Sequence, residues 1–126
     1  IVDCIIEDAD DVISGKSDVS ATLRFTHDSY MVPLMSYMDI EGVNYNPVED
    51  AFGNFKDYEF VSMGTNIQLF FYRNASGEIL VRILMNERET LLASIAPVQS
   101  VFYRWADLKK FWMDRGVQLQ KMFENQ

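Results

Sequence analysis

A histidine followed directly by an aspartate is the residue pair with the clearest chemical potential in this sequence. His27 is the only histidine among the 126 residues, and Asp28 and Ser29 follow it. An imidazole donates hydrogen bonds to anionic oxygens, and a carboxyl group can give a proton to a leaving group. Without context the pair is a weak signal, because Asp28 or Ser29 could equally cap a helix and leave His27 an incidental half-buried side chain.

The residues around this pair predict a junction between a strand and a helix. Residues 21–26 alternate small or apolar with polar side chains and are rich in strand formers. Four apolar residues then recur at helical spacing: Met31, Leu34, Met35 and Met38. Pro33 suits only the beginning of that helix, where a backbone N–H has no intrahelical partner. Since a helix N-terminus attracts phosphate, the junction suits an anion site.

Residues 23–34, with the sequence LRFTHDSYMVPL, resemble the C-terminal motif of the histidine acid phosphatases. In that family a strand delivers a His-Asp pair to the active site, and a helix with an early Pro-Leu follows. Residues 63–73 resemble the family's downstream strand and residues 81–86 its hairpin partner, so the resemblance spans about residues 20–115. Within that family, the matching segments are similar to bacterial phytases and inositol-polyphosphate phosphatases.

The resemblance implies a role for each member of the pair. His27 would bind the phosphate, and Asp28 would be the proton donor to the leaving alcohol oxygen. A phosphate dianion beside Asp28 favours the protonated carboxyl by charge repulsion, which predicts an acidic working pH. The substrates would be phosphomonoesters, with inositol phosphates as one class. A periplasmic or otherwise extracytoplasmic location is implied as well.

The family's nucleophile motif, Arg-His-Gly-x-Arg-x-Pro, does not occur in this sequence. In the family its histidine becomes phosphorylated, and His27 cannot serve as both nucleophile and phosphate ligand. We therefore expect the chain to be the C-terminal part of a histidine acid phosphatase domain, inactive alone and completed by the N-terminal part of the same protein. Relatives that attack inositol phosphates often carry His-Ala-Glu where this chain has His27-Asp28, which leaves the substrate open.

Two other interpretations remain open. The chain could be a non-catalytic α/β phosphate-binding or interaction domain in which residues 23–28 are structural, or a degenerate phosphatase that binds phosphate without turnover. Arg24 could reach the phosphate or enter a salt bridge, because strand alternation permits both directions. The remaining arginines considered are expected to be surface charges of the hairpin and the last helix: Arg73, Arg82, Arg88 and Arg104.

Composition limits the classes of partner. The net charge of −8 disfavours nucleic acids and acidic membranes, which are held mainly by clustered Lys and Arg. No segment is apolar for long enough to suggest a membrane helix. The acidic run at residues 7–11 is expected to be a solvated helix face rather than a metal site, and Cys4 a buried small hydrophobe. The sequence indicates no cofactor and no metal.

These elements predict one α/β domain over residues 1–126. A helix is expected over residues 1–14, because Val2, Ile6, Ala9 and Ile13 form one stripe. Residues 39–65 show no period and predict a long ordered loop.

Residues 67–72 and 79–84 predict a β-hairpin covered on both faces. Its connector holds the sequence Asn74-Ala75-Ser76, which is either a glycosylation acceptor or a hairpin tip. From about Arg104 onward a long amphipathic helix should bury Trp105 and Trp112, and Gly116 within it suggests a kink or close packing.

Overall fold

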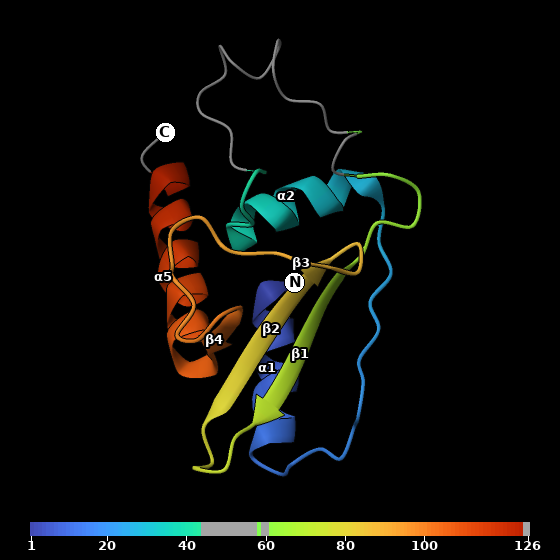
Figure 1. The fold of residues 1–126 in the computed structure, drawn as a ribbon. Helices are drawn as coiled ribbons and strands as arrows, with labels where there is room; N and C mark the ends of the chain where they lie inside the picture. The colour runs from blue at the N-terminus through green and yellow to red at the C-terminus, as the bar shows by residue number, and fades with distance from the viewer. Residues whose placement is uncertain (44–57, 59–60, 125–126) are drawn as a thin grey trace.

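Helices pack against a small antiparallel sheet, which makes the chain an α/β fold (Figure 1). The computed structural model describes residues 1–43, 58 and 61–124. In chain order the elements are α1 (Val2–Ile13), α2 (Asp28–Met38), β1 (Ile67–Arg73), β2 (Ile79–Met85), β3 (Arg88–Glu89), β4 (Phe102–Arg104) and α5 (Trp105–Glu124). The expected fold class is confirmed, including the hairpin and the long C-terminal helix.

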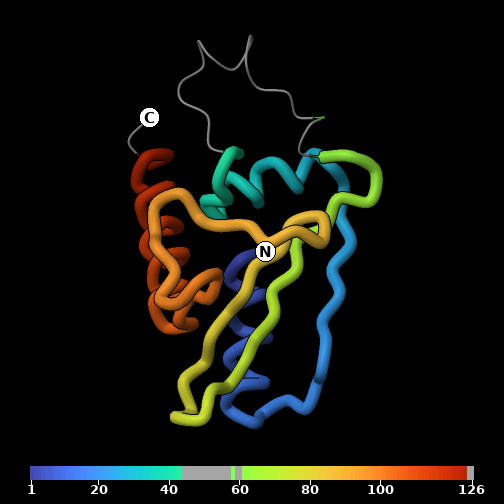
Figure 2. The backbone as a smooth tube through the Cα atoms, in the orientation of Figure 1, coloured from blue at the N-terminus to red at the C-terminus, as the bar shows by residue number. Residues whose placement is uncertain are grey.

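Strand β2 is the centre of the sheet. It pairs with β1 along its whole length, from Ile67 opposite Met85 to Arg73 opposite Ile79. Its other edge pairs with the short strands β3 and β4, and every pairing is antiparallel. Val81 and Ile83 of β2 are fully buried against the helices. The path of the chain through this sheet can be followed in Figure 2.

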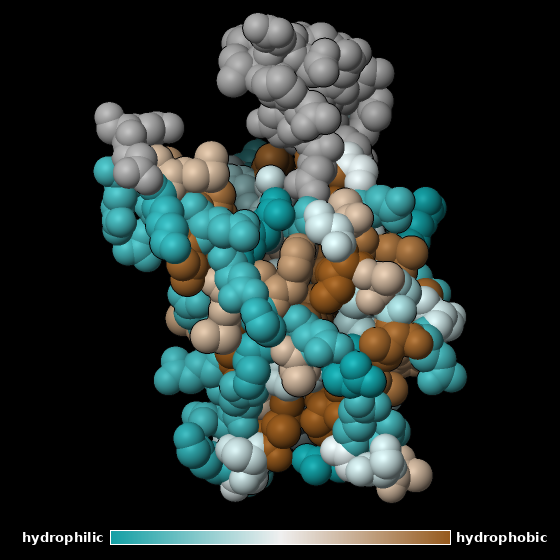
Figure 3. All heavy atoms as spheres, turned by 90° about the vertical axis from the view of Figure 1, so that its left-hand side faces the viewer, coloured by the Kyte–Doolittle hydropathy of each residue, from teal (hydrophilic) through white to brown (hydrophobic). Residues whose placement is uncertain are grey.

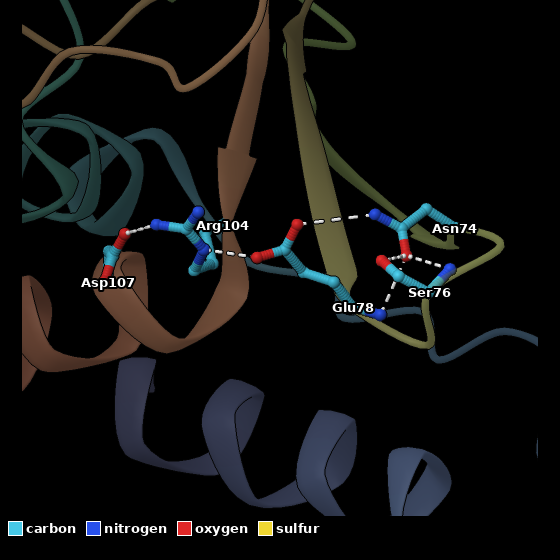
Figure 4. A network of polar contacts seen from close by, with 5 residues as sticks. All are labelled: Asn74, Ser76, Glu78, Arg104 and Asp107. Atoms are coloured by element: carbon cyan, nitrogen blue, oxygen red, sulfur yellow. Dashed lines mark hydrogen bonds and ion pairs between the residues drawn. The ribbon is translucent and has the colours of Figure 1, made fainter.

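The hairpin connector is closed by the side chain of Asn74 (Figure 4). Its Oδ1 accepts hydrogen bonds from the Ser76 N–H and hydroxyl and from the Glu78 N–H, at 3.1, 2.8 and 2.8 Å. Glu78 in turn pairs with Arg104, which also bonds Asp107. This is the Asx-type turn for which asparagine is favoured, and it ties the tip to the start of α5.

Asn74→Ala is expected to lower the free energy of unfolding by about 1–2 kcal/mol, because three donors lose their common acceptor. Ser76→Ala is the matched control, since it removes a single one of those hydrogen bonds and should cost about half as much or less. Urea denaturation of both variants measures the difference. Equal costs would show that Asn74 Oδ1 does not organise the turn.

The core lies between the sheet and the helices. Its largest fully buried side chains are Trp112, Tyr103, Met35 and Met38. Trp105 stacks edge-on against Trp112 and against Phe71 of β1, with ring centroids 6.3 and 5.1 Å apart. The two tryptophans are therefore core residues, as core packing of α5 predicted.

Helices α1 and α5 are linked through Asp10. Its carboxylate accepts hydrogen bonds from the Trp105 indole N–H and the Lys109 ammonium, both at 2.9 Å. Burial alone would raise the pKa of Asp10, but these hydrogen bonds and the Lys109 charge outweigh it and lower the pKa. A lowered carboxyl pKa gives stability that is present above the unfolded value and is lost as the pH falls through the folded one. Strong acid should therefore loosen this contact.

The apolar stripe of the first helix is confirmed. Val2 and Ile6 are buried, and Ala9 and Ile13 pack against the core. Hydrophilic residues cover most of the side on which α5 lies, and hydrophobic residues show between them (Figure 3). Within the described ranges, none of the helices combines the length and apolar character needed to cross a membrane.

The expected strand over residues 21–26 is wrong. These residues run without regular structure from the end of α1 to the beginning of α2, and Leu23 and Phe25 are 78% and 93% exposed. A strand exists only where a neighbouring strand supplies backbone partners, and no described strand pairs with this segment. Residue types set a preference for extended backbone, but they could not supply the missing partner.

Three smaller expectations also need correction. Cys4 is exposed, because it lies on the outer side of α1 rather than on the Val2–Ile6 stripe. Coverage of both sheet faces does not hold for β1, where Phe70 and Tyr72 are 44% and 41% exposed opposite the helical layer. Pro33 lies inside α2 rather than in its first turn, since α2 begins at Asp28. Much of the loop expected over residues 39–65, namely 44–57 and 59–60, lies outside the described residues.

Candidate active site at the beginning of helix α2

His27 and Asp28 stand where the connecting segment turns into α2. His27 is the N-cap residue with extended backbone angles, φ −94° and ψ 162°. Its carbonyl accepts hydrogen bonds from the N–H groups of Tyr30 and Met31, at 3.0 and 3.2 Å. The backbone therefore changes from extended to helical between the two motif residues, as the sequence predicted, although the segment before them is not a strand.

The Asp28 carboxylate folds back onto the first turn of the helix. Its Oδ1 accepts the Ser29 N–H at 2.7 Å, which is a charge-assisted hydrogen bond. A negative charge at this end of a helix is also favoured by the helix dipole. The N–H groups of residues 29–31 are thus engaged within the turn, so an incoming anion would meet the side chains of His27 and Asp28 first.

Both motif side chains are exposed, and so is every other residue from 18 to 30. Two hollows of the described surface are lined by neither His27 nor Asp28. One, of about 410 Å³, lies between α1 and Met113 of α5, and the other, of about 250 Å³, lies between α1 and α2. The described residues therefore present His27 and Asp28 on an open rim and do not enclose a substrate there.

Arg24 contacts α1 and not the motif. Its guanidinium pairs with Asp8 at 2.5 Å and donates to the Cys4 carbonyl at 3.4 Å. Of its two expected directions, the salt bridge is the one found. Arg73, Arg82 and Arg104 also bind partners other than the motif, namely the Ile13 carbonyl, Glu89 and Glu78. Arg73 is exposed, as expected for a surface charge, whereas Arg82 and Arg104 are half-buried.

The other end of α2 is fastened to α5 by four polar contacts. The Tyr37 hydroxyl donates to the Trp112 carbonyl at 2.9 Å, and the Trp112 indole N–H donates to the Met38 carbonyl at 3.2 Å. Arg115 donates to the Ser36 carbonyl at 3.0 Å and pairs with Asp39 at 3.5 Å. We call this set the α2–α5 joint. Sequence reasoning missed Asp39 and Arg115, whose large separation along the chain gives no signal.

Gly116 was the one sign of the joint in the sequence. A Cβ at this position would lie 2.6 Å from the Tyr37 hydroxyl oxygen, so the close packing expected as one of two alternatives is found at the glycine. The acidic run of α1 is partly paired, because Asp8, Asp10 and Asp11 contact Arg24, Lys109 and Lys16. Among the described residues, no three His, Cys, Asp or Glu side chains gather as metal ligands would.

Fold and site together define an α/β protein with an exposed His-Asp pair at a helix N-terminus. The family model of the histidine phosphatase superfamily (branch 2) matches residues 4–86, about two thirds of the chain, and includes both motif residues. The chain therefore belongs to the histidine phosphatase superfamily, whose members act on phosphate esters. The comparison with curated proteins gives no match.

Proposed function

We propose that this chain supplies the proton donor and a phosphate-binding histidine to a phosphomonoesterase that works through a phosphohistidine. The observation that carries the proposal is the exposed pair at the beginning of α2, His27 and Asp28, in a chain of this superfamily. His27 donates to a phosphate oxygen, and Asp28 protonates the leaving oxygen as the P–O bond breaks. Because His27 is the only histidine, the nucleophile comes from the N-terminal part of the same protein.

The exposure of His27 and Asp28 supports an active site that is divided between this chain and the N-terminal part of the protein. A phosphatase site needs bulk water kept from the phosphate, apart from the one molecule that hydrolyses the phosphohistidine, and several cationic or N–H donors around the phosphate. The described residues place His27 on the rim but turn Arg24 away to Asp8. The resemblance of residues 23–34 supports an acid phosphatase or phytase-like enzyme outside the cytoplasm, with inositol phosphates as one substrate class.

The 126-residue chain alone is expected to hydrolyse p-nitrophenyl phosphate no faster than buffer does, because it has no nucleophilic histidine beside His27. The assay compares the purified chain with the full-length protein at equal concentration. Turnover by the chain alone would overturn the division of the site. The full-length sequence should also contain an Arg-His-Gly-x-Arg-x-Pro stretch, and its absence would overturn the enzymatic proposal.

A second candidate is a non-catalytic phosphate-binding or interaction domain. Leu23 and Phe25 favour it, since both are strongly exposed next to the motif and exposed apolar side chains are common at interaction sites. The two candidates differ in one measurement, because only the enzyme loses turnover when Asp28 is changed in the full-length protein.

A further inference from the structure

The two ends of α2 are held very differently. At its beginning, Asp28, Ser29 and Tyr30 are exposed, and the segment leading to them makes no strand pairing in the described part of the chain. At its end, Met35 and Met38 are fully buried and the α2–α5 joint supplies the polar contacts. The direction of α2, and with it the place of the motif, is therefore set mainly from its C-terminal end.

The α2–α5 joint also places a positive charge at the C-terminal end of α2. The last turn of α2 contains no basic residue of its own. Arg115 brings a positive charge from α5 to the Ser36 carbonyl, where the negative end of the helix dipole lies. Asp39, 1% exposed, follows the helix, pairs with Arg115 and accepts the Ser94 N–H at 2.7 Å.

Tyr37 is seated against the backbone of α5. Burial raises the pKa of Tyr37, the charge of Asp3 adds to this and that of Arg115 opposes it, so the hydroxyl stays protonated and donates to Trp112. The ring can approach this closely only because position 116 has no Cβ, since an alanine Cβ would lie 2.6 Å from the hydroxyl oxygen but 3.7 Å from the ring carbon that bears it. The fit is thus limited by the hydroxyl oxygen alone.

From this geometry we infer that Gly116, Tyr37 and Arg115 are positioning residues, which aim α2 so that Asp28 meets the leaving group. The inference rests on the proposed function of Asp28. Helix α2 is continuous from Asp28 to Met38, with Pro33 inside it, so a displacement at its C-terminal end is carried toward Asp28. Misplacement of a catalytic group by about 1 Å can cost about 100-fold in rate. The joint touches no substrate, so its residues act only through α2.

The test is Gly116→Ala with Tyr37→Phe as the rescue. Alanine favours the helix but displaces the Tyr37 hydroxyl. Helix α5 should therefore stay folded, while the close contact between Tyr37 and α5 is lost. Phenylalanine removes the clashing oxygen and lets the ring return. In the chain itself, the amide NMR resonances of Asp28 and Ser29 should shift in Gly116→Ala and move back in the double variant. Unmoved Asp28 and Ser29 resonances, with those of Tyr37 shifted, would overturn the inference.

The full-length protein gives the catalytic readout. Gly116→Ala should lower kcat about tenfold for an alkyl phosphate, a poor leaving group, and about twofold for p-nitrophenyl phosphate, with KM unchanged, since only part of the 10²–10⁴-fold gain from general acid catalysis is lost. The double variant should regain most of it. If Asp28→Asn lowers kcat more for the alkyl phosphate than for p-nitrophenyl phosphate and Gly116→Ala does not, the positioning role is wrong and Asp28 remains the proposed proton donor. If neither variant shows this difference, the proposed function of Asp28 is wrong as well.

Discussion

Asp28→Asn in the full-length protein is expected to lower kcat/KM for alkyl phosphates by about 100- to 1000-fold, within the range that general acid catalysis contributes. For p-nitrophenyl phosphate the loss should be about tenfold or less, because its leaving group departs without a proton. The substitution leaves the fold intact, since an asparagine oxygen can still accept the Ser29 N–H that Asp28 accepts at 2.7 Å. It therefore isolates the transferable proton.

Steady-state kinetics with a series of leaving groups measures this effect. The slope of log kcat/KM against leaving-group acidity should be steeper in the variant than in the parent protein. Asp18→Asn is the matched control, because Asp18 is an exposed acid on the same connecting segment and should leave the slope unchanged. Equal losses for good and poor leaving groups would argue that Asp28 binds or organises rather than donates a proton.

Periodicity predicted the helices, and two β-prone runs joined by turn residues predicted the hairpin, because those elements carry their own hydrogen bonds. The stripes Val2–Ile6 and Met31–Met35–Met38 are buried as expected, and β1 pairs with β2 over seven residues each. The hairpin turn is closed by contacts between the Asn74 side chain and residues close to it in the sequence, so the turn can also be predicted from neighbouring residues. Local information was sufficient for all of these elements.

The missing strand and the undecided direction of Arg24 share one physical cause, which is dependence on a partner distant in the sequence. Residues 21–26 have strand-forming side chains, but a ladder needs a second backbone that composition does not reveal. Arg24 had two permitted directions, and the position of Asp8 on α1 decided between them. The motif itself was visible because His27 and Asp28 are adjacent, whereas nothing local joins Asp39 to Arg115.

Arg115→Met is expected to lower the free energy of unfolding by about 3 kcal/mol. The substitution keeps a long side chain in place but takes the Arg115 guanidinium away from the carboxylate of Asp39, 1% exposed, and from the Ser36 carbonyl. Removing one member of a buried ion pair typically costs about 3–5 kcal/mol. The lower end applies because the Arg115 side chain is 28% exposed and Asp39 keeps the Ser94 N–H.

Chemical denaturation of the 126-residue chain provides the measurement, with Lys110→Met as the control on the same helix. Lys110 pairs with Asp114 at the surface, with the two side chains 76% and 58% exposed, so its loss should change stability little. Asp39→Asn in the Arg115→Met background should recover part of the loss, because a neutral amide can still accept the Ser94 N–H without a buried charge. If Arg115→Met costs no more than Lys110→Met, the Asp39–Arg115 pair does not stabilise the fold, and α2 is held by its buried methionines and by the hydrogen bonds of Tyr37 and Trp112.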